Sequence, residues 1–482
     1  MGDLLSRRHA FYAPWPWRQA TARTSNIDHP DGNGSLATNL ARGSAAAFAV
    51  YVAGAAVTYC AQLALARVIG ANGYGVYAYV FAWVSVSAYA AALGFNVSLM
   101  RFVPAYQAQQ AWSHLRGVIQ YASRRTIAAG CGVAVIGSAV VLNRAADMPP
   151  ELATTFLIGL ALVPILASLW VRSAVVRALG GVVSALAPDR LVRDIVLLGL
   201  IGLASVGAWR TADAPAAMAA TVIGAAAGLG LVSFAMHRLM PSAAAGSTPA
   251  YEAQIWRRTA LPLVVIGAAN ILMNRTGVLL LGWIVGTKDA GIYALAFNFA
   301  LVTALPQTAV NALLTPAISN LFVRNERTAL RTMIANAALW TLIASVGTAL
   351  PIAILAKPLL ALFGHDFGAG APALRVLLIG QVFVAGAGSQ LYLLTMTGHE
   401  RSAATLLACG VALNAALGAA LIGRFGPTGA ATAAAIAMIA LNAAMAFSVW
   451  QNLRFSPGVL AGLQRRIHED TQTVRPGEHA AE

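Results

Sequence analysis

Long apolar runs follow one another along most of the chain, separated by short polar segments. A helix needs about 20 mostly apolar residues to cross the hydrocarbon core of a bilayer. Applied as a window, that length predicts twelve transmembrane helices, of which 126–142 and 195–209 are the shortest. They are expected near residues 45–65, 74–94, 126–142, 152–170, 195–209, 215–236, 260–285, 291–314, 334–355, 371–395, 402–423 and 428–450.

The composition agrees with this pattern. Apolar residues make up 59% of the 482 residues and charged residues 10%, whereas a soluble domain carries roughly a quarter charged residues. So few charges could not cover the surface of a soluble protein of this size. The sequence therefore predicts an all-α polytopic membrane protein whose solvent is the lipid bilayer.

The basic residues predict an orientation. If the N-terminus is cytoplasmic, the cytoplasmic segments carry 24 of the 32 Lys and Arg residues, the opposite segments carry seven, and Arg275 alone falls inside a span. This alternating excess follows the positive-inside rule. Both termini are therefore expected in the cytoplasm of a bacterial cell, with the chain in its inner membrane. The net charge of +15 is spread between apolar runs, which excludes a nucleic-acid partner.

A repeated motif divides the chain into two halves. Residues 68–81 read VIGANGYGVYAYVF and residues 284–297 read IVGTKDAGIYALAF, with Gly70, Gly75 and Tyr77 matching residues 216 positions later. Six predicted helices separate the copies, so the halves share one orientation and form parallel repeats. The expected organisation is a tail at 1–42, six-helix bundles at 43–237 and 259–452 joined by a cytoplasmic linker at 238–258, and a tail at 453–482.

Six stretches, taken in order, carry a resemblance to a known family. They are Arg67–Tyr79 with Arg101–Tyr106, Gly286–Ala294, Leu359–Phe367 (LLALFGHDF), Leu394–Glu400 (LTMTGHE) and Leu413–Ala433 (LNAALGAALIGRFGPTGAATA). Over roughly residues 36–455 the chain resembles the Wzx-type polysaccharide flippases of the multidrug/oligosaccharidyl-lipid/polysaccharide (MOP) exporter superfamily.

The resemblance implies two six-helix bundles in a V around a cationic cavity. It also implies an activity: moving an undecaprenyl-pyrophosphate-linked oligosaccharide between leaflets, alongside polysaccharide polymerase and export machinery. The chain departs from the family in the seventh span, where it reads RTGVLLLG. Gly277 stands where related proteins often carry an acidic residue, which puts ion coupling through that carboxylate in doubt.

Arg275 is the leading candidate for substrate binding, with Asn270 and Asn274 close on the same helix. A charge placed mid-span costs a few kcal/mol on insertion scales, so it normally faces a cavity or a partner. A guanidinium can bind phosphate oxygens in a fork, which suits a lipid pyrophosphate. The alternative is a structural arginine bound to backbone carbonyls.

Two further groups of residues are candidates. Gln307 and Asn311 lie four residues apart on one helical face beside Pro306, where they could contact sugar hydroxyls and where the proline could kink the span. Arg101 could attract an anionic headgroup at the cytoplasmic mouth, although membrane topology is the simpler explanation of its position.

The acidic residues bear on the substrate class. All 17 Asp and Glu fall outside the predicted spans, which favours an anionic substrate over the cations of a multidrug antiporter. No metal-ligand spacing, phosphate-binding loop or nucleophile constellation is present, so neither a cofactor nor an enzyme activity is predicted. A multidrug antiporter, a lipid II flippase and a membrane glycan polymerase or ligase remain alternatives.

Overall fold

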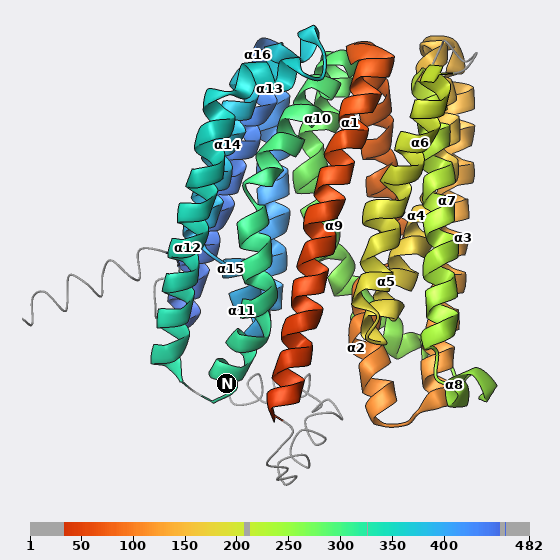
Figure 1. The fold of residues 1–482 in the computed structure, drawn as a ribbon, viewed down its shortest axis with the longest axis vertical. Coiled ribbons are helices and arrows are strands. Elements are labelled where there is room, and N and C mark those ends of the chain that lie inside the picture. Colours follow the sequence, from red (N-terminus) through yellow and green to blue (C-terminus); the bar gives the residue numbers. More distant parts are fainter. Residues whose placement is uncertain (1–32, 207–212, 325, 454–457, 459–482) are drawn as a thin grey trace, which may run out of the picture.

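The structure, a computed structural model, describes residues 33–206, 213–324, 326–453 and 458. These residues are almost entirely helical and contain no strand (Figure 1). The elements are α1 (Asn33–Ala91), α2 (Phe95–Ala108), α3 (Trp112–Asn143), η3 (Ala145–Asp147), α4 (Pro150–Ala178), α5 (Val182–Ala187), η4 (Pro188–Val192), α6 (Arg193–Val206), α7 (Ala214–Leu239), α8 (Ser242–Gly246), α9 (Ala253–Ile284), α10 (Thr287–Val302), α11 (Leu305–Val323), α12 (Arg327–Ile354), α13 (Ala356–Ala361), η5 (His365–Gly370), α14 (Ala371–Ala387), α15 (Gln390–Met396) and α16 (Glu400–Leu453).

The fold is that of an all-α polytopic membrane protein. Within the described residues, eight helices are long and apolar enough to span a bilayer, or nine if the bent pair α10–α11 is one span. α1 and α16 each contain two predicted spans, because non-helical backbone at Gly70 and at Gly426 breaks them. α6 covers most of the short span predicted at 195–209, whose last three residues lie outside the described part.

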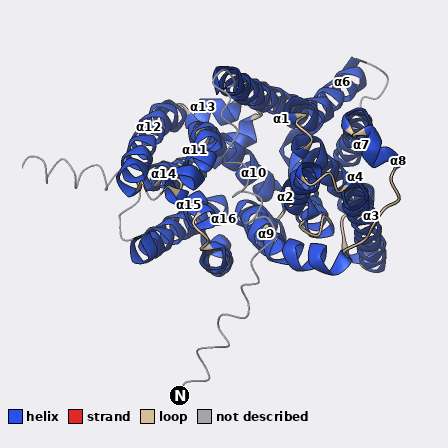
Figure 2. Ribbon diagram, turned by 90° about the horizontal axis from the view of Figure 1, so that it is seen from below, coloured by secondary structure: helices blue, strands red, loops and turns tan. Residues whose placement is uncertain are grey.

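The helices form two groups that lie side by side (Figure 2). In one group α4 packs against α7, α3 and α1, while in the other α16 packs against α9 and α14. The groups meet where α1 packs on α10 and α9. The predicted domain boundaries remain predictions. The tails lie mostly outside the described residues, although the stretch 33–42, predicted as tail, already forms the start of α1.

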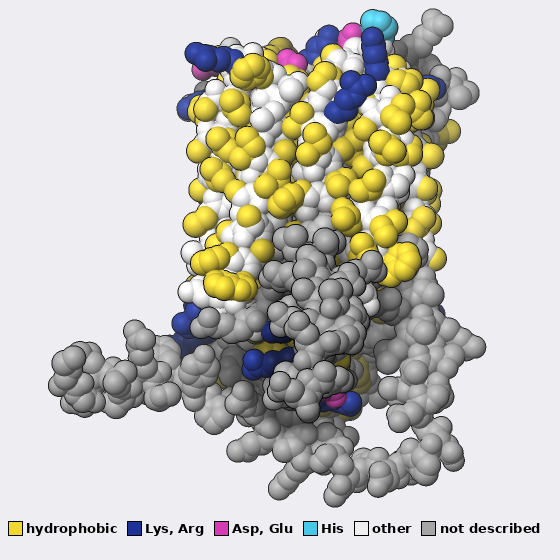
Figure 3. Space-filling model, turned by 90° about the vertical axis from the view of Figure 1, so that its left-hand side faces the viewer, with side chains coloured by type: hydrophobic (Ala, Val, Ile, Leu, Met, Phe, Trp, Pro, Cys, Tyr) yellow, Lys and Arg dark blue, Asp and Glu magenta, His cyan; other side chains and the backbone are white. Residues whose placement is uncertain are grey.

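The surface matches a lipid environment. A broad band of apolar side chains separates two ends where charged side chains gather (Figure 3). Large apolar residues are widely exposed on this band, among them Trp283 at 78% and Leu203 at 72%. Such exposure would be unfavourable in water, whereas lipid accepts it. We call the two ends of the bundle, after residues that lie there, the Lys288 end and the Arg101 end.

The two copies of the repeated motif pack directly against each other near the Lys288 end. Each copy begins at a helix break with positive φ, at Gly70 and at Gly286. A Cβ built on Gly75 would lie 2.2 Å from the carbonyl oxygen of Thr287, and one built on Gly291 would lie 2.6 Å from the Cα of Gly75. Because neither position has room for a side chain, glycine lets the backbones of α1 and α10 touch here.

Other contacts between the groups lie near the same end. Arg67 donates from Nε to the carbonyl of Leu362 at 2.7 Å, and Tyr74 packs edge-on against Phe367. The bend predicted near Pro306 is confirmed, because α10 and α11 meet at 50°.

Candidate functional site

Arg275 lies where the two groups of helices face each other. It stands nine residues before Ile284, the last residue of α9, which is about 14 Å along the axis. Its side of α9 turns toward α1, since Gly267 meets the Tyr89 ring and Gly282 meets Tyr79. The helix therefore aims Arg275 into the protein rather than into the bilayer.

A second arginine contacts the same aromatic ring as Arg275. The guanidinium carbon Cζ of Arg275 lies 5.6 Å from the centre of the Phe81 ring, and that of Arg193 lies 5.8 Å from it. Phe81 is on α1 and Arg193 opens α6, so three elements from both groups of helices meet here. A cation within about 6 Å of a ring face is attracted by its quadrupole. One ring thus interacts with two cations.

Arg193 is balanced by carboxylates, whereas Arg275 is not. Arg193 pairs with Asp194 at 3.0 Å and with Asp189 at 3.2 Å. Asp194 is only 4% exposed and also accepts a hydrogen bond from the hydroxyl of Thr58. Arg275 makes no salt bridge within the part of the chain that the structure describes, so its charge has no described counter-ion.

The buried cluster around Arg193 corrects two sequence-based expectations. Thr58 lies inside the span predicted at 45–65, and the Arg193 backbone oxygen would lie 2.6 Å from a Cβ on Gly224, near the middle of α7. Asp194 is therefore a carboxylate inside the helical bundle, and Arg275 is not the only buried cation. Hydropathy assigned the stretch PDRLVRD to a cytoplasmic loop, although the four-residue spacing of Asp189 and Arg193 is typical of a helical ion pair.

Tyrosines extend the site from Phe81 toward the Lys288 end. Tyr77 stacks on Phe81 with ring centres 6.0 Å apart, and its hydroxyl lies 3.1 Å from the Thr221 hydroxyl. Tyr74 follows, donating to the side-chain oxygen of Gln62. These hydroxyls already have partners, so they shape the site and leave Arg275 as its unmatched charge.

Asn270 and Asn274 lie beside Arg275 on α9. The side-chain nitrogen of Asn274 donates to the Asn270 carbonyl at 3.0 Å. Asn270 is exposed, and on the helical wheel it falls between the side that meets α1 and the side where Gly277 meets Tyr293 of α10. Its exposure is therefore to the space between the groups of helices, on the same helix as Arg275. Whether these amides bind substrate stays a prediction.

The remaining candidates lie apart from Arg275. Gln307 donates to the carbonyl of Gly388 at 3.4 Å, and Asn311 accepts from the Ser389 hydroxyl. Both amides therefore hold the break between α14 and α15, inside the group of helices that contains α16. Arg101 forms a 3.7 Å ion pair with Glu400, and both side chains are about half exposed. None of these contacts involves Arg275, and a substrate role for these residues stays a prediction.

The described residues contain no group of three or more His, Cys, Asp or Glu side chains placed to hold a metal ion. The site contains an arginine without a described counter-ion, a charge-balanced arginine, an aromatic ring that both contact, and nearby amides. Such a set binds anions by charge-assisted hydrogen bonds.

Comparison with solved structures identifies the fold. A multidrug resistance MATE family transporter of the MOP superfamily in an inward-facing conformation aligns over 82% of this chain and 94% of its own, with a TM-score of 0.68 and 13% identity. A variant of the Vibrio cholerae MATE transporter VcmN aligns over 87% of this chain and 98% of its own, with a TM-score of 0.59 and 17% identity. The lipid II flippase MurJ in an inward closed conformation aligns over 83% of this chain and 87% of its own, with a TM-score of 0.57 and 14% identity.

No protein-family model and no curated protein sequence matches the chain. At these low identities the likeness shows the fold alone. The chain thus has the fold shared by MATE transporters and the MurJ flippase, two branches of the MOP superfamily.

Proposed function

We propose that the chain is a MOP-type transporter that flips a polyprenyl-pyrophosphate-linked oligosaccharide across the bacterial inner membrane for cell-surface polysaccharide biosynthesis. Neighbours in structure that are transporters or flippases, and not enzymes, support the transporter class. The observation that carries the substrate class is Arg275, a cation between the two groups of helices with no described counter-ion.

An anionic ligand would relieve an energetic cost at Arg275. A buried charge without a partner costs several kcal/mol, even after the protein relaxes around it. A pyrophosphate could bind the Arg275 guanidinium in a bidentate manner, with Arg193 about equally close to the Phe81 ring. A cationic drug would instead be repelled by the unbalanced charge.

Alternating access supplies the movement in this proposal. The positive-inside rule assigns the Arg101 end to the cytoplasm, so the packed contacts of Gly75 with Gly291 and of Arg67 with Leu362 would close the periplasmic side. The lipid would enter from the cytoplasmic leaflet. Release on the other side requires these contacts between the groups to separate.

Arg275→Ala tests the proposal directly. We expect the variant to reach the membrane in normal amount but to lose export of the glycan in cells and flipping of undecaprenyl-pyrophosphate-linked oligosaccharide in proteoliposomes. Arg375→Ala is the matched control, because Arg375 is exposed and donates to the Ala353 carbonyl at 3.0 Å, away from Arg275. Undiminished flipping by Arg275→Ala would exclude the pyrophosphate role.

A MATE-like multidrug antiporter is the second candidate, and the buried Asp194 favours it, since membrane carboxylates commonly carry ions in such pumps. Asp194→Asn discriminates between the two. If the chain is an antiporter, the variant loses drug-driven proton or sodium movement in proteoliposomes. If it is a flippase, wild type shows no such movement, and Asp194→Asn lowers thermal stability because Arg193 keeps only Asp189.

A further inference from the structure

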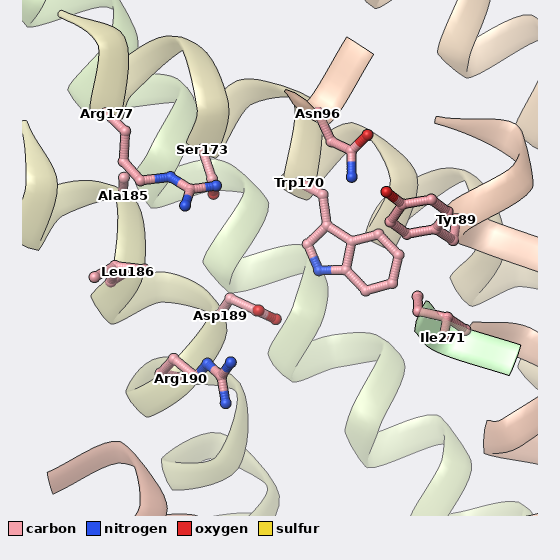
Figure 4. Close-up of a pocket in the computed structure, with 10 residues that line it drawn as sticks. All are labelled: Tyr89, Asn96, Trp170, Ser173, Arg177, Ala185, Leu186, Asp189, Arg190 and Ile271. Carbon is pink, nitrogen blue, oxygen red and sulfur yellow. The ribbon is translucent and has the colours of Figure 1, made fainter. Parts of the chain in front are cut away.

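A cavity of about 300 Å³ lies about one helical turn from Arg275 and Arg193. Its walls come from α1, α2, α4, α5, η4 and α9, so it too lies between the groups of helices (Figure 4). Ile271 in its wall precedes Arg275 by one turn of α9, and Asp189 precedes its partner Arg193 by four residues. Along α9 the offset is therefore about 6 Å.

The cavity is polar in a way that lipid chains would not match. Three of its ten lining residues, Ala185, Leu186 and Ile271, are aliphatic. The others carry a carboxylate, guanidinium groups, an amide, a hydroxyl and two aromatic rings. They are Asp189, Arg177, Arg190, Asn96, Ser173, Tyr89 and Trp170. An acyl or polyprenyl chain placed here would desolvate these groups without bonding to them.

Two buried polar atoms of Asn96 and Ser173 in this wall have no hydrogen-bond partner among the residues that the structure describes. They are the side-chain oxygen of Asn96 and the hydroxyl of Ser173, a residue that is 5% exposed. A buried polar atom left without a hydrogen bond costs about 1–3 kcal/mol. A ligand that brings hydroxyl groups would satisfy both, since it can donate to Asn96 and either donate to or accept from Ser173.

Aromatic rings supply the other half of the recognition. The rings of Tyr89 and Trp170 lie 6.2 Å apart at 53° and both border the cavity (Figure 4). The negative face of such a ring attracts partly positive hydrogens, and the C–H bonds on one face of a pyranose present them. Stacking on an aromatic ring with surrounding amide, carboxylate and guanidinium groups is the chemistry that binds a sugar.

We infer that this cavity binds the sugar next to the pyrophosphate of the transported lipid, an inference that rests on the proposed function. A pyrophosphate at Arg275 and Arg193 would leave the first sugar about one helical turn away, at Asp189 and Ile271. The arginines would then recognise the part that all such lipids share. The cavity would recognise the glycan and so decide which lipid is carried.

The test compares lipids with and without sugar in nanodiscs. The probes are undecaprenyl pyrophosphate and the same lipid carrying a neutral hexose disaccharide or a disaccharide that begins with a hexuronic acid. We expect wild type to bind at least one disaccharide lipid about tenfold more tightly than the sugar-free lipid, an effect equivalent to one or two hydrogen bonds.

Ser173→Ala and Trp170→Leu should abolish that preference and leave the affinity for undecaprenyl pyrophosphate unchanged. Ser168→Ala is the matched control for the first, because Ser168 is a buried serine of α4 outside the cavity wall. Trp340→Leu, at an exposed tryptophan of α12, controls for the second. Both controls should keep the preference.

The outcomes separate the two proposals. If wild type binds none of the three lipids, the proposed function fails. If wild type binds all three equally, or if Ser173→Ala and Trp170→Leu keep the preference for sugar, the inference about the cavity is overturned while the flippase proposal stands.

Discussion

Gly75→Ala should push the protein out of the conformation described above. The added methyl group would lie 2.2 Å from the Thr287 carbonyl oxygen, whereas ordinary contact begins near 3.4 Å. The backbones of α1 and α10 would have to separate by about 1 Å, since the clash is with main chain that cannot rotate away. Overpacking of this kind costs about 1–3 kcal/mol.

The cost falls on the state in which the Lys288 end is closed. If opening that end separates Gly75 from Thr287, the substitution penalises one state alone. A difference of about 1–3 kcal/mol shifts the equilibrium about 5- to 150-fold toward opening. The closed state should then become the minor one if the two begin near balance.

A cysteine pair can report the closed fraction. Arg67→Cys and Leu362→Cys, placed where a 2.7 Å hydrogen bond joins the two groups of helices, would be cross-linked by a short bifunctional maleimide after the three native cysteines are replaced by alanine. We expect the initial cross-linking rate to fall at least fivefold when Gly75→Ala is added. Gly132→Ala is the control, because its methyl group would meet no atom within 4 Å.

An unchanged cross-linking rate in a folded Gly75→Ala protein would refute the reasoning. Lower thermal stability with an unchanged rate would mean that the crossing of α1 and α10 persists in every conformation, and that opening happens elsewhere.

Three further substitutions test the packing around the site. Phe81→Leu should lower the melting temperature in scanning fluorimetry because both guanidiniums lose their ring, each cation–π contact being worth about 0.5–2 kcal/mol; Phe81→Tyr should not. Trp256→Phe should cost about 1 kcal/mol in chemical unfolding, because the indole no longer donates to the Tyr106 hydroxyl at 3.0 Å. Glu400→Gln should change stability by less than about 1 kcal/mol in a double-mutant cycle with Arg101→Gln, since that ion pair is about half exposed.

Trp256 shows how tertiary structure overrides a local pattern. By sequence it closes a polar linker, yet it is fully buried. Its ring packs 5.4 Å from Tyr121 of α3, and its nitrogen reaches Tyr106 of α2. The start of α9 is thereby fastened to the first group of helices. Nothing in the spacing of residues 238–258 signals these contacts, because both partners lie more than 130 residues earlier in the chain.

The helical membrane fold could be predicted from the sequence, because each span is a local property. About 20 apolar residues must pair their own backbone groups in lipid. The sequence also singled out Arg275, since one charge in an apolar run is visible without any partner.

The surroundings of Arg275 depend on tertiary packing and could not be predicted from the sequence. Thr58 donates a hydrogen bond to Asp194, which lies 136 residues later in the chain. The Phe81 ring contacts Arg193 and Arg275, which are 82 positions apart in the chain. A hydropathy window averages Arg193 and Asp194 into a polar loop, because it cannot register that opposite charges neutralise each other inside a bundle. Pairing of distant charges is a property of packing, and packing placed them beside the one arginine that the sequence had already marked.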